Sequence, residues 1–188
     1  MATTVTTPLS REKARALRAG DSVSLSGVIY TARDEAHKRI AREVEEGKPL
    51  PFPIEGAVIY YVGPTPEKPG RVIGSAGPTS SYRMDSYTPG LVRLGLSGMI
   101  GKGSRGTQVI AAMKEHGAVY FAAVGGAGAL LAGCVESSEV VAYSDLGTEA
   151  IRKLVVRDMP LVVAVDCMGN DLYEQGRKAY LRANTQNL

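Results

Sequence analysis

Three polar segments of the chain carry a cation beside small or hydroxyl side chains, a pattern that suits the binding of an anion. In the segment GPTSSYRMDS, residues 77–86, Thr79 and Ser80 precede Arg83 and Asp85. A guanidinium binds a carboxylate through two parallel hydrogen bonds, and a hydroxyl beside it can hydrogen-bond a ligand or carry a proton. The segment is therefore either a simple turn or part of a polar site for an anionic substrate.

Two further segments repeat this pattern. Arg33 stands in the first turn of a predicted helix, where the helix dipole disfavours a cation by about 0.3–1 kcal/mol and Asp34 is available to neutralise it. The free N–H groups of such a turn, together with a guanidinium, also make a carboxylate site. Lys102 and Arg105 lie in the glycine-rich segment GKGSRG. If the three segments converge, they suit a small dicarboxylate, with one guanidinium for each carboxylate and a lysine for the remaining charge.

Glycine-rich runs at two places do not match the nucleotide-binding fingerprints. GGAGALL follows a predicted strand, but Leu131 stands where G-x-G-x-x-G requires a third glycine or alanine. In GMIGKGS, Gly103 separates Lys102 from Ser104, which a phosphate-binding P-loop would place side by side. The glycines are better explained by tight packing than by a bound nucleotide.

The two histidines do not complete a hydrolase triad, because the sequence has no G-x-S-x-G segment to hold a nucleophile. His116 directly precedes Gly117, a predicted helix end, where a cation interacts favourably with the helix dipole. His37 lies four residues beyond Arg33 and is either a structural residue or part of the site.

Composition sets the broad class of the protein. The 188 residues fit a single domain, 1–188, which can bury roughly 70% of the surface of its unfolded chain. A net charge of +3 is too balanced for a protein that depends on nucleic-acid phosphates. We find no apolar leader and no membrane-length apolar run, so we expect neither secretion nor a membrane partner. Cys134 and Cys167 stand far apart, which favours a reducing, cytoplasmic location over a zinc site or disulfides.

Predicted helices and strands alternate along the chain. Residues 21–32 are predicted to form a strand that bends at Gly27, and residues 31–48 a helix that Thr31 caps and Gly47 ends. Residues 146–158 begin helical and turn into a strand-like edge. The other elements are a helix at 107–117 and strands at 56–64, 71–78, 118–124, 139–145 and 160–170. Several strands are too closely spaced for parallel crossovers, which predicts one α/β domain with a mixed sheet.

Four segments of the sequence together resemble one family: GVIYTARDEAHKR, GPTSSYRMDSYT, MIGKG and DLGTEAI. In this order, over about residues 17–176, they are similar to the β-subunit, or C-terminal domain, of the iron–sulfur class I fumarases and L(+)-tartrate dehydratases. The resemblance implies a swivelling β/β/α domain, similar to the mobile domain of aconitases, that closes over a [4Fe–4S] cluster. Because two isolated cysteines cannot ligate that cluster, an α-subunit partner and a hetero-oligomer are implied.

The resemblance also implies which residues act. The family's carboxylate-binding arginines fall on Arg33 and Arg83, and its proton-handling threonine and active-site lysine fall on Thr79 and Lys102. Thr79 and Lys102 are thus the expected catalytic residues, and no metal ligand is expected in this chain. The expected substrate-binding residues are Arg33, Arg83, Ser80 and Asp85.

The resemblance implies a reversible loss of water from a 2-hydroxydicarboxylate, with (S)-malate and fumarate as the leading pair. An L(+)-tartrate dehydratase that gives oxaloacetate is the near alternative, because Ser80 and Tyr82 stand where fumarases commonly have Thr and Gly, and Ser104 where they commonly have Asn. A stand-alone dicarboxylate-binding module on the same fold is the alternative of another class.

Overall fold

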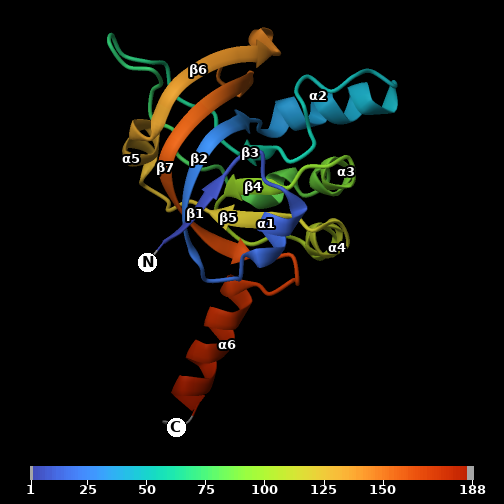
Figure 1. Ribbon diagram of the computed structural model, residues 1–188, viewed down its shortest axis with the longest axis vertical. Helices are drawn as coiled ribbons and strands as arrows, with labels where there is room; N and C mark the ends of the chain where they lie inside the picture. The colour runs from blue at the N-terminus through green and yellow to red at the C-terminus, as the bar shows by residue number, and fades with distance from the viewer. Residues whose placement is uncertain (1, 186–188) are drawn as a thin grey trace.

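The computed structural model describes residues 2–185 and contains one seven-stranded sheet with helices around it (Figure 1). The strands are β1 (Thr3–Thr6), β2 (Ser22–Thr31), β3 (Val58–Tyr60), β4 (Gly98–Gly101), β5 (Val119–Ala122), β6 (Val135–Ala142) and β7 (Ile151–Val165). The helices are α1 (Arg11–Ala16), α2 (Asp34–Glu45), α3 (Thr88–Arg93), α4 (Thr107–His116), α5 (Gly128–Gly133) and α6 (Leu172–Thr185), with 3-10 helices η1 (Ser81–Met84) and η2 (Ser144–Glu149).

The sheet closes on itself. Its strand order is β1-β2-β3-β4-β5-β7-β6, and β2 pairs with β7 as well, so that β2, β3, β4, β5 and β7 form a barrel-like ring. β1 to β5 run parallel to one another, whereas β7 is antiparallel to β2, β5 and β6. The predicted α/β domain with a mixed sheet is confirmed, and it agrees with a β/β/α arrangement. The carboxyl ends of β2 to β5 consequently lie at the same edge of the sheet.

The two faces of the ring carry separate parts of the core. In β3 and the residue after it, Val58 and Tyr60 join a cluster with strands β2, β5 and β7, while Ile59 and Tyr61 join a cluster with α2, α3 and α4. This alternation follows from the two-residue period of a strand. Figure 1 shows α2, α3 and α4 together on one side of the sheet, whereas α6 projects away from the body towards the C-terminus. Within residues 2–185, no helix has the length and apolar character needed to cross a membrane.

The region from residue 146 onward differs from its prediction. It forms the short helix η2 and then one continuous strand, β7, instead of two separate strand segments. Asp158 and Pro160 break the sequence pattern, but the sheet accommodates both. Asp158 adopts a left-handed φ of 49° and donates its N–H to Ser26 Oγ at 2.9 Å, and Pro160 is exposed opposite Ser24. Figure 1 shows that β7 is strongly curved.

Two other expectations are wrong. Residues 71–78 form no strand, because the segment folds back on Thr65, which accepts the N–H of Ser75 through Oγ1 at 2.8 Å. Thr31 does not cap α2, because its side chain is buried in β2, where it donates to the Ala150 carbonyl. The N-cap is Arg33. The predicted irregularity at Gly27 is confirmed by a shift in the β2–β7 register between Leu25 and Gly27.

Candidate anion-binding site

The residues predicted to act follow the carboxyl ends of parallel strands. Arg33 comes two residues after β2, and Lys102 directly follows β4. Thr79 is fixed to the end of β3, because its N–H donates to the carbonyl of Tyr61 at 2.7 Å. Ligands of α/β sheets commonly bind outside this edge. The closed ring thus places three polar segments that are distant in sequence at one edge.

The backbones of the segment at 79–81 and the segment that follows β4 are paired. The N–H of Lys102 donates to the carbonyl of Thr79 at 3.3 Å, and the N–H of Ser81 donates to the carbonyl of Lys102 at 2.9 Å. Ser80 and Lys102 form a parallel β-bridge. Gly101 permits this close approach, since a Cβ atom there would lie 2.0 Å from Ser81 Oγ. The structure thus brings the predicted Thr79, Ser80 and Lys102 together.

The segment beyond Lys102 is held from two sides at Gly103. The buried hydroxyl of Tyr120 donates to the Gly103 carbonyl at 2.9 Å and lies 2.9 Å from Ser81 Oγ. The hydroxyl of Tyr173 in α6 accepts the Gly103 N–H at 3.2 Å. Burial raises the pKa of Tyr120 well above its usual value, so its hydroxyl keeps its proton and remains a donor. These contacts fix the course of the chain next to Lys102.

Arg33 and Arg83 meet at the carboxylate of Asp34. Arg83 Nε lies 2.7 Å from Asp34 Oδ1, and Arg33 Nε lies 3.5 Å from Asp34 Oδ2. Arg33 Nη2 lies 3.5 Å from Oε1 of Glu149 in η2, whose Oε2 accepts the N–H of Glu35 at 2.9 Å. The two predicted carboxylate-binding arginines are therefore neighbours. Sequence reasoning treated Asp34 only as a neutralising charge and missed Glu149, although it lies within the DLGTEAI segment.

Asp85 and Arg105 form a buried pair below this surface. Asp85 Oδ1 accepts from Arg105 Nε at 2.8 Å, and Oδ2 accepts the N–H of Gly106 at 2.6 Å. The Arg105 guanidinium donates to Thr88 Oγ1 and lies over the ring of Tyr120. Protein donors contact both carboxylate oxygens and the Asp85 side chain is 10% exposed, so this geometry favours a structural role for Asp85, and its predicted contact with substrate stays a prediction. Arg105, likewise, does not join the exposed cations of the edge, since its side chain is fully buried.

His37 is a buried residue that holds the N-terminus of α2. Its Nδ1 lies 2.8 Å from the carbonyl oxygen of Arg33, which can only accept, so Nδ1 carries the proton. Burial lowers the pKa of His37 to about 4, so the ring is neutral at pH 7. Its place beside Arg33 makes it a structural support of the edge. His116 occupies the predicted helix end, where Gly117 has a left-handed φ of 77°.

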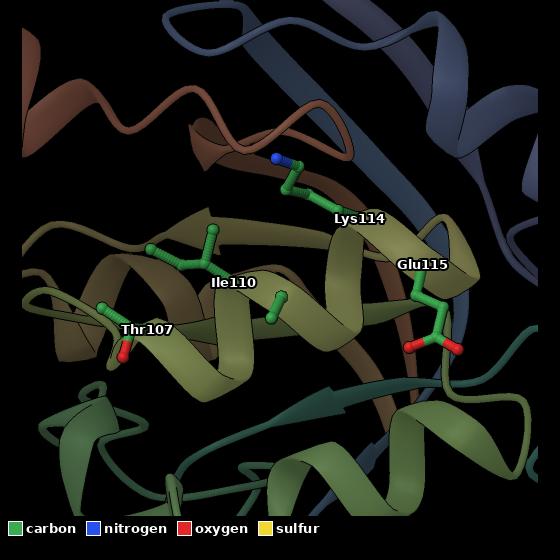
Figure 2. A pocket seen from close by; sticks show the side chains of 5 residues that line it. Thr107, Ile110, Lys114 and Glu115 are labelled. Atoms are coloured by element: carbon green, nitrogen blue, oxygen red, sulfur yellow. The ribbon is translucent and has the colours of Figure 1, made fainter.

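Two hollows of the described surface lie away from these residues. The hollow in Figure 2, about 550 Å³, lies along one face of α4 and is lined by Thr107, Ile110, Ala111, Lys114 and Glu115. A cleft of about 490 Å³ lies between α2 and α3 and reaches His37. Neither includes Arg33, Thr79, Arg83 or Lys102. The strand edge, with its neighbouring arginines, hydroxyls and lysine, therefore remains a candidate site on its chemistry alone, without a hollow of this size to support it.

Cysteine ligands for a cluster are too few in this chain. A [4Fe–4S] cluster requires at least three cysteine thiolates, and the sequence has two cysteines. Both are free thiols, and burial raises the pKa of the Cys134 thiol, which disfavours the thiolate that binds metal. The residues present do not fit the cluster, and within residues 2–185 no group of three His, Cys, Asp or Glu side chains is placed to hold a metal ion.

Fold and site together define an α/β domain that presents two arginines, hydroxyl groups and a lysine at the carboxyl edge of parallel strands. The sequence profile of the family named Fumarase C-terminus matches residues 2–176. The chain belongs to this family, whose match begins earlier in the sequence than the resemblance at about residue 17.

Individual relatives agree with this membership. A putative L(+)-tartrate dehydratase subunit beta of Methanocaldococcus jannaschii is 38% identical over 183 residues, 94% of each chain. The aerobic class I fumarate hydratase of Escherichia coli K12 is 43% identical over 155 residues, which are 81% of this chain and 28% of that enzyme. A putative class I fumarate hydratase of Geobacillus stearothermophilus is 36% identical over 97% of this chain and 36% of its own. The chain thus spans about a third or less of these fumarate hydratases.

Proposed function

We propose that this chain is the β-subunit of a two-subunit hydro-lyase that reversibly dehydrates (S)-malate to fumarate and is active only with an α-subunit. The meeting of Arg33 and Arg83 at the same edge as the paired Thr79 and Lys102 carries this proposal. Two guanidinium groups can bind the two carboxylates of the substrate, whereas a single guanidinium could bind only one of them. The relatives named class I fumarate hydratase support the reaction class.

Each residue of the edge has a role in this reaction. Arg33 and Arg83 bind the carboxylates and stabilise the negative charge that builds up as the C3 proton leaves. In this proposal Thr79 takes the C3 proton as an alkoxide, its own hydroxyl proton having passed to a neighbouring base such as a carboxylate of the partner, and the hydroxyl leaves from C2 as hydroxide while the double bond forms. Because a threonine hydroxyl is a weak acid, either the charge of Lys102, whose backbone pairs with Thr79, or that partner carboxylate has to lower the cost of this transfer. Ser80 donates a hydrogen bond to the substrate.

The remaining chemistry belongs to the partner in this proposal. A [4Fe–4S] cluster bound by the α-subunit supplies a Lewis acid for the leaving hydroxyl. The relative named subunit beta supports a separate partner, because it matches this chain over 94% of both lengths. Asp85 acts by holding the segment at 105–106, not by touching substrate. Free cysteines and a cluster enzyme both fit a reducing, cytoplasmic location.

L(+)-tartrate dehydratase is the second candidate, favoured by the same full-length match to the Methanocaldococcus relative. The test is anaerobic co-production with the α-subunit from the same source, cluster reconstitution, and turnover of malate beside tartrate. Wild-type turnover of malate together with its loss in Arg83→Ala and Thr79→Ala supports the proposed fumarase. Arg11→Ala, an exposed arginine at the start of α1, is the control and retains activity.

The substrates separate the candidates. Turnover of tartrate alone moves the assignment to the dehydratase. If neither substrate turns over and the isolated chain binds a dicarboxylate tightly, it is a binding module. Full activity of Thr79→Ala contradicts the proton-transfer role of Thr79 whichever substrate is used.

A further inference from the structure

The Asp34 carboxylate lies between two arginines that come from different elements. Arg33 is the residue before it, whereas Arg83 belongs to η1, nearly fifty positions further along the chain. The Asp34 side chain is 25% exposed, and its Oδ1 lies only 2.7 Å from Arg83 Nε. Without Asp34, two guanidinium groups would stand together at a helix N-terminus, where both their mutual repulsion and the helix dipole oppose them. The anion between them offsets both effects.

Asp34 also determines which edge of the Arg83 guanidinium is left accessible to a ligand. The ion pair uses Nε of Arg83, and within residues 2–185 its two terminal nitrogens, Nη1 and Nη2, have no other partner. The side chain is 42% exposed. The Nη1–Nη2 edge of a guanidinium can bind both oxygens of one carboxylate. Asp34 therefore holds Arg83 by its inner nitrogen and leaves that edge accessible.

Arg33 is more enclosed than Arg83, since its side chain is 23% exposed and that of Arg83 is 42% exposed. Besides Asp34, it has Glu149 at Nη2, and a Cβ atom at Gly63 would lie 2.8 Å from its Nη1. Glu149 itself is anchored by the N–H of Glu35. Asp34 thus lies between the two arginines, 3.5 Å from the enclosed Arg33 and 2.7 Å from the more exposed Arg83, and its Oδ2 makes no hydrogen bond within residues 2–185.

We propose that Asp34 is a positioning residue, which holds Arg33 and Arg83 together as one two-armed site for a dicarboxylate. This inference rests on the proposed function and adds a residue to which no role in the reaction has been assigned. It predicts that removing Asp34 weakens substrate binding. The same contact could have the opposite effect. If Asp34 instead competed with the substrate for Arg83, its removal would tighten substrate binding.

The test compares Asp34→Ala and Asp34→Asn with a matched control in the assembled α–β complex. Asp145→Asn is the control, since Asp145 of η2 binds Arg39 of α2 at 2.7–2.8 Å and thereby joins the elements that carry Glu149 and Asp34 without touching Arg33 or Arg83. We expect KM for the dicarboxylate to rise about tenfold or more in Asp34→Ala, less in Asp34→Asn, and little in Asp145→Asn. The rise in KM exceeds the fall in kcat.

A second measurement reads the contact itself in the full β-chain. The Nε–Hε resonance of Arg83, assigned by its loss in Arg83→Lys, is sensitive to the Asp34 carboxylate 2.7 Å from Nε, and we expect its chemical shift to change in Asp34→Ala but not in Asp145→Asn. Thermal unfolding of each variant confirms that it is folded. An unchanged or lowered KM in Asp34→Ala overturns the positioning role. A wild-type complex that dehydrates neither malate nor tartrate refutes the proposed function instead. An unaltered Arg83 resonance in Asp34→Ala then overturns the inference separately.

Discussion

Replacing Asp85 with Asn gives the most direct test of the buried pair beneath the site. The Arg105 side chain is completely buried and the Asp85 side chain is 10% exposed, so the substitution leaves a buried cation without its counter-charge. Breaking a buried ion pair from one side costs about 3–5 kcal/mol. Because Asn keeps one oxygen that can accept from Arg105 Nε or from Gly106 N–H, we expect the free energy of unfolding to fall by about 3 kcal/mol, the lower end of this range.

The loss is measurable by urea unfolding and by thermal melting. For a chain of this size, each kcal/mol shifts Tm by about 2–4 °C, so about 3 kcal/mol corresponds to roughly 6–12 °C. Glu136→Gln is the matched control, since Glu136 pairs with Arg157 at the surface, where an ion pair contributes at most about 1 kcal/mol.

The double variant Asp85→Leu with Arg105→Met distinguishes the loss of the whole ion pair from the loss of only one of its charges. Removing both charges eliminates the uncompensated cation, so the double variant should be more stable than Asp85→Asn. A loss below about 1 kcal/mol in Asp85→Asn would refute the reasoning, because Arg105 would then not depend on that charge. Retained stability with lost turnover would return Asp85 to the substrate, as the sequence first indicated.

Two further predictions concern the neighbours of this pair. The pKa of His37 is about 4 in the folded chain and about 6.5 when unfolded, so stability is complete above pH 6.5 and falls by about 3 kcal/mol as pH drops to 4. Urea unfolding of His37→Gln between pH 7 and 4.5 should show a shallower loss than the wild type, and equal slopes would contradict the assignment. Gly101→Ala should lose about 1–3 kcal/mol, because its Cβ would lie 2.0 Å from Ser81 Oγ, whereas Gly133→Ala, with nothing within 4 Å, should lose nothing. Urea unfolding also measures the stability of these two glycine variants, and equal stability of Gly101→Ala and Gly133→Ala would contradict the prediction.

Local patterns in the sequence were sufficient to predict individual helices and strands, but not the strand pairing that closes the sheet into a ring. The period of the helix at 31–48 and the apolar run at 118–124 predict α2 and β5 because neighbouring residues determine both. The pairing of β2 with β7 joins segments more than a hundred residues apart and has no local signature. The sequence predicted two segments separated near Pro160 in place of the single strand β7. Only the strand pairing in the sheet shows that the missing N–H of Pro160 is tolerated there.

Candidate site residues could be chosen from the sequence where their chemistry is exposed, but the sequence does not reveal where a distant partner takes a residue's charge. Arg33, Arg83 and Lys102 stand out as cations among small polar residues, and the structure places them at one edge. Asp85 looks identical in sequence to a ligand-binding carboxylate. Its partner Arg105 is twenty residues away and becomes buried only when Tyr61 and Tyr120 cover it. Burial, which the sequence does not specify at a loop, decides between the two roles.

The closed ring also limits how this chain can associate with copies of itself. Among the described strands, only β1 and β6 have an unpaired side, since β2 is flanked by β7 on one side and by β1 and then β3 on the other. β1 is four residues long, and β6 exposes Glu136 and Glu139, features that oppose the addition of a foreign strand. The strands that Arg33 and Lys102 follow, β2 and β4, have neighbouring strands on both sides. An aggregate that grows strand by strand would therefore have to begin away from the site.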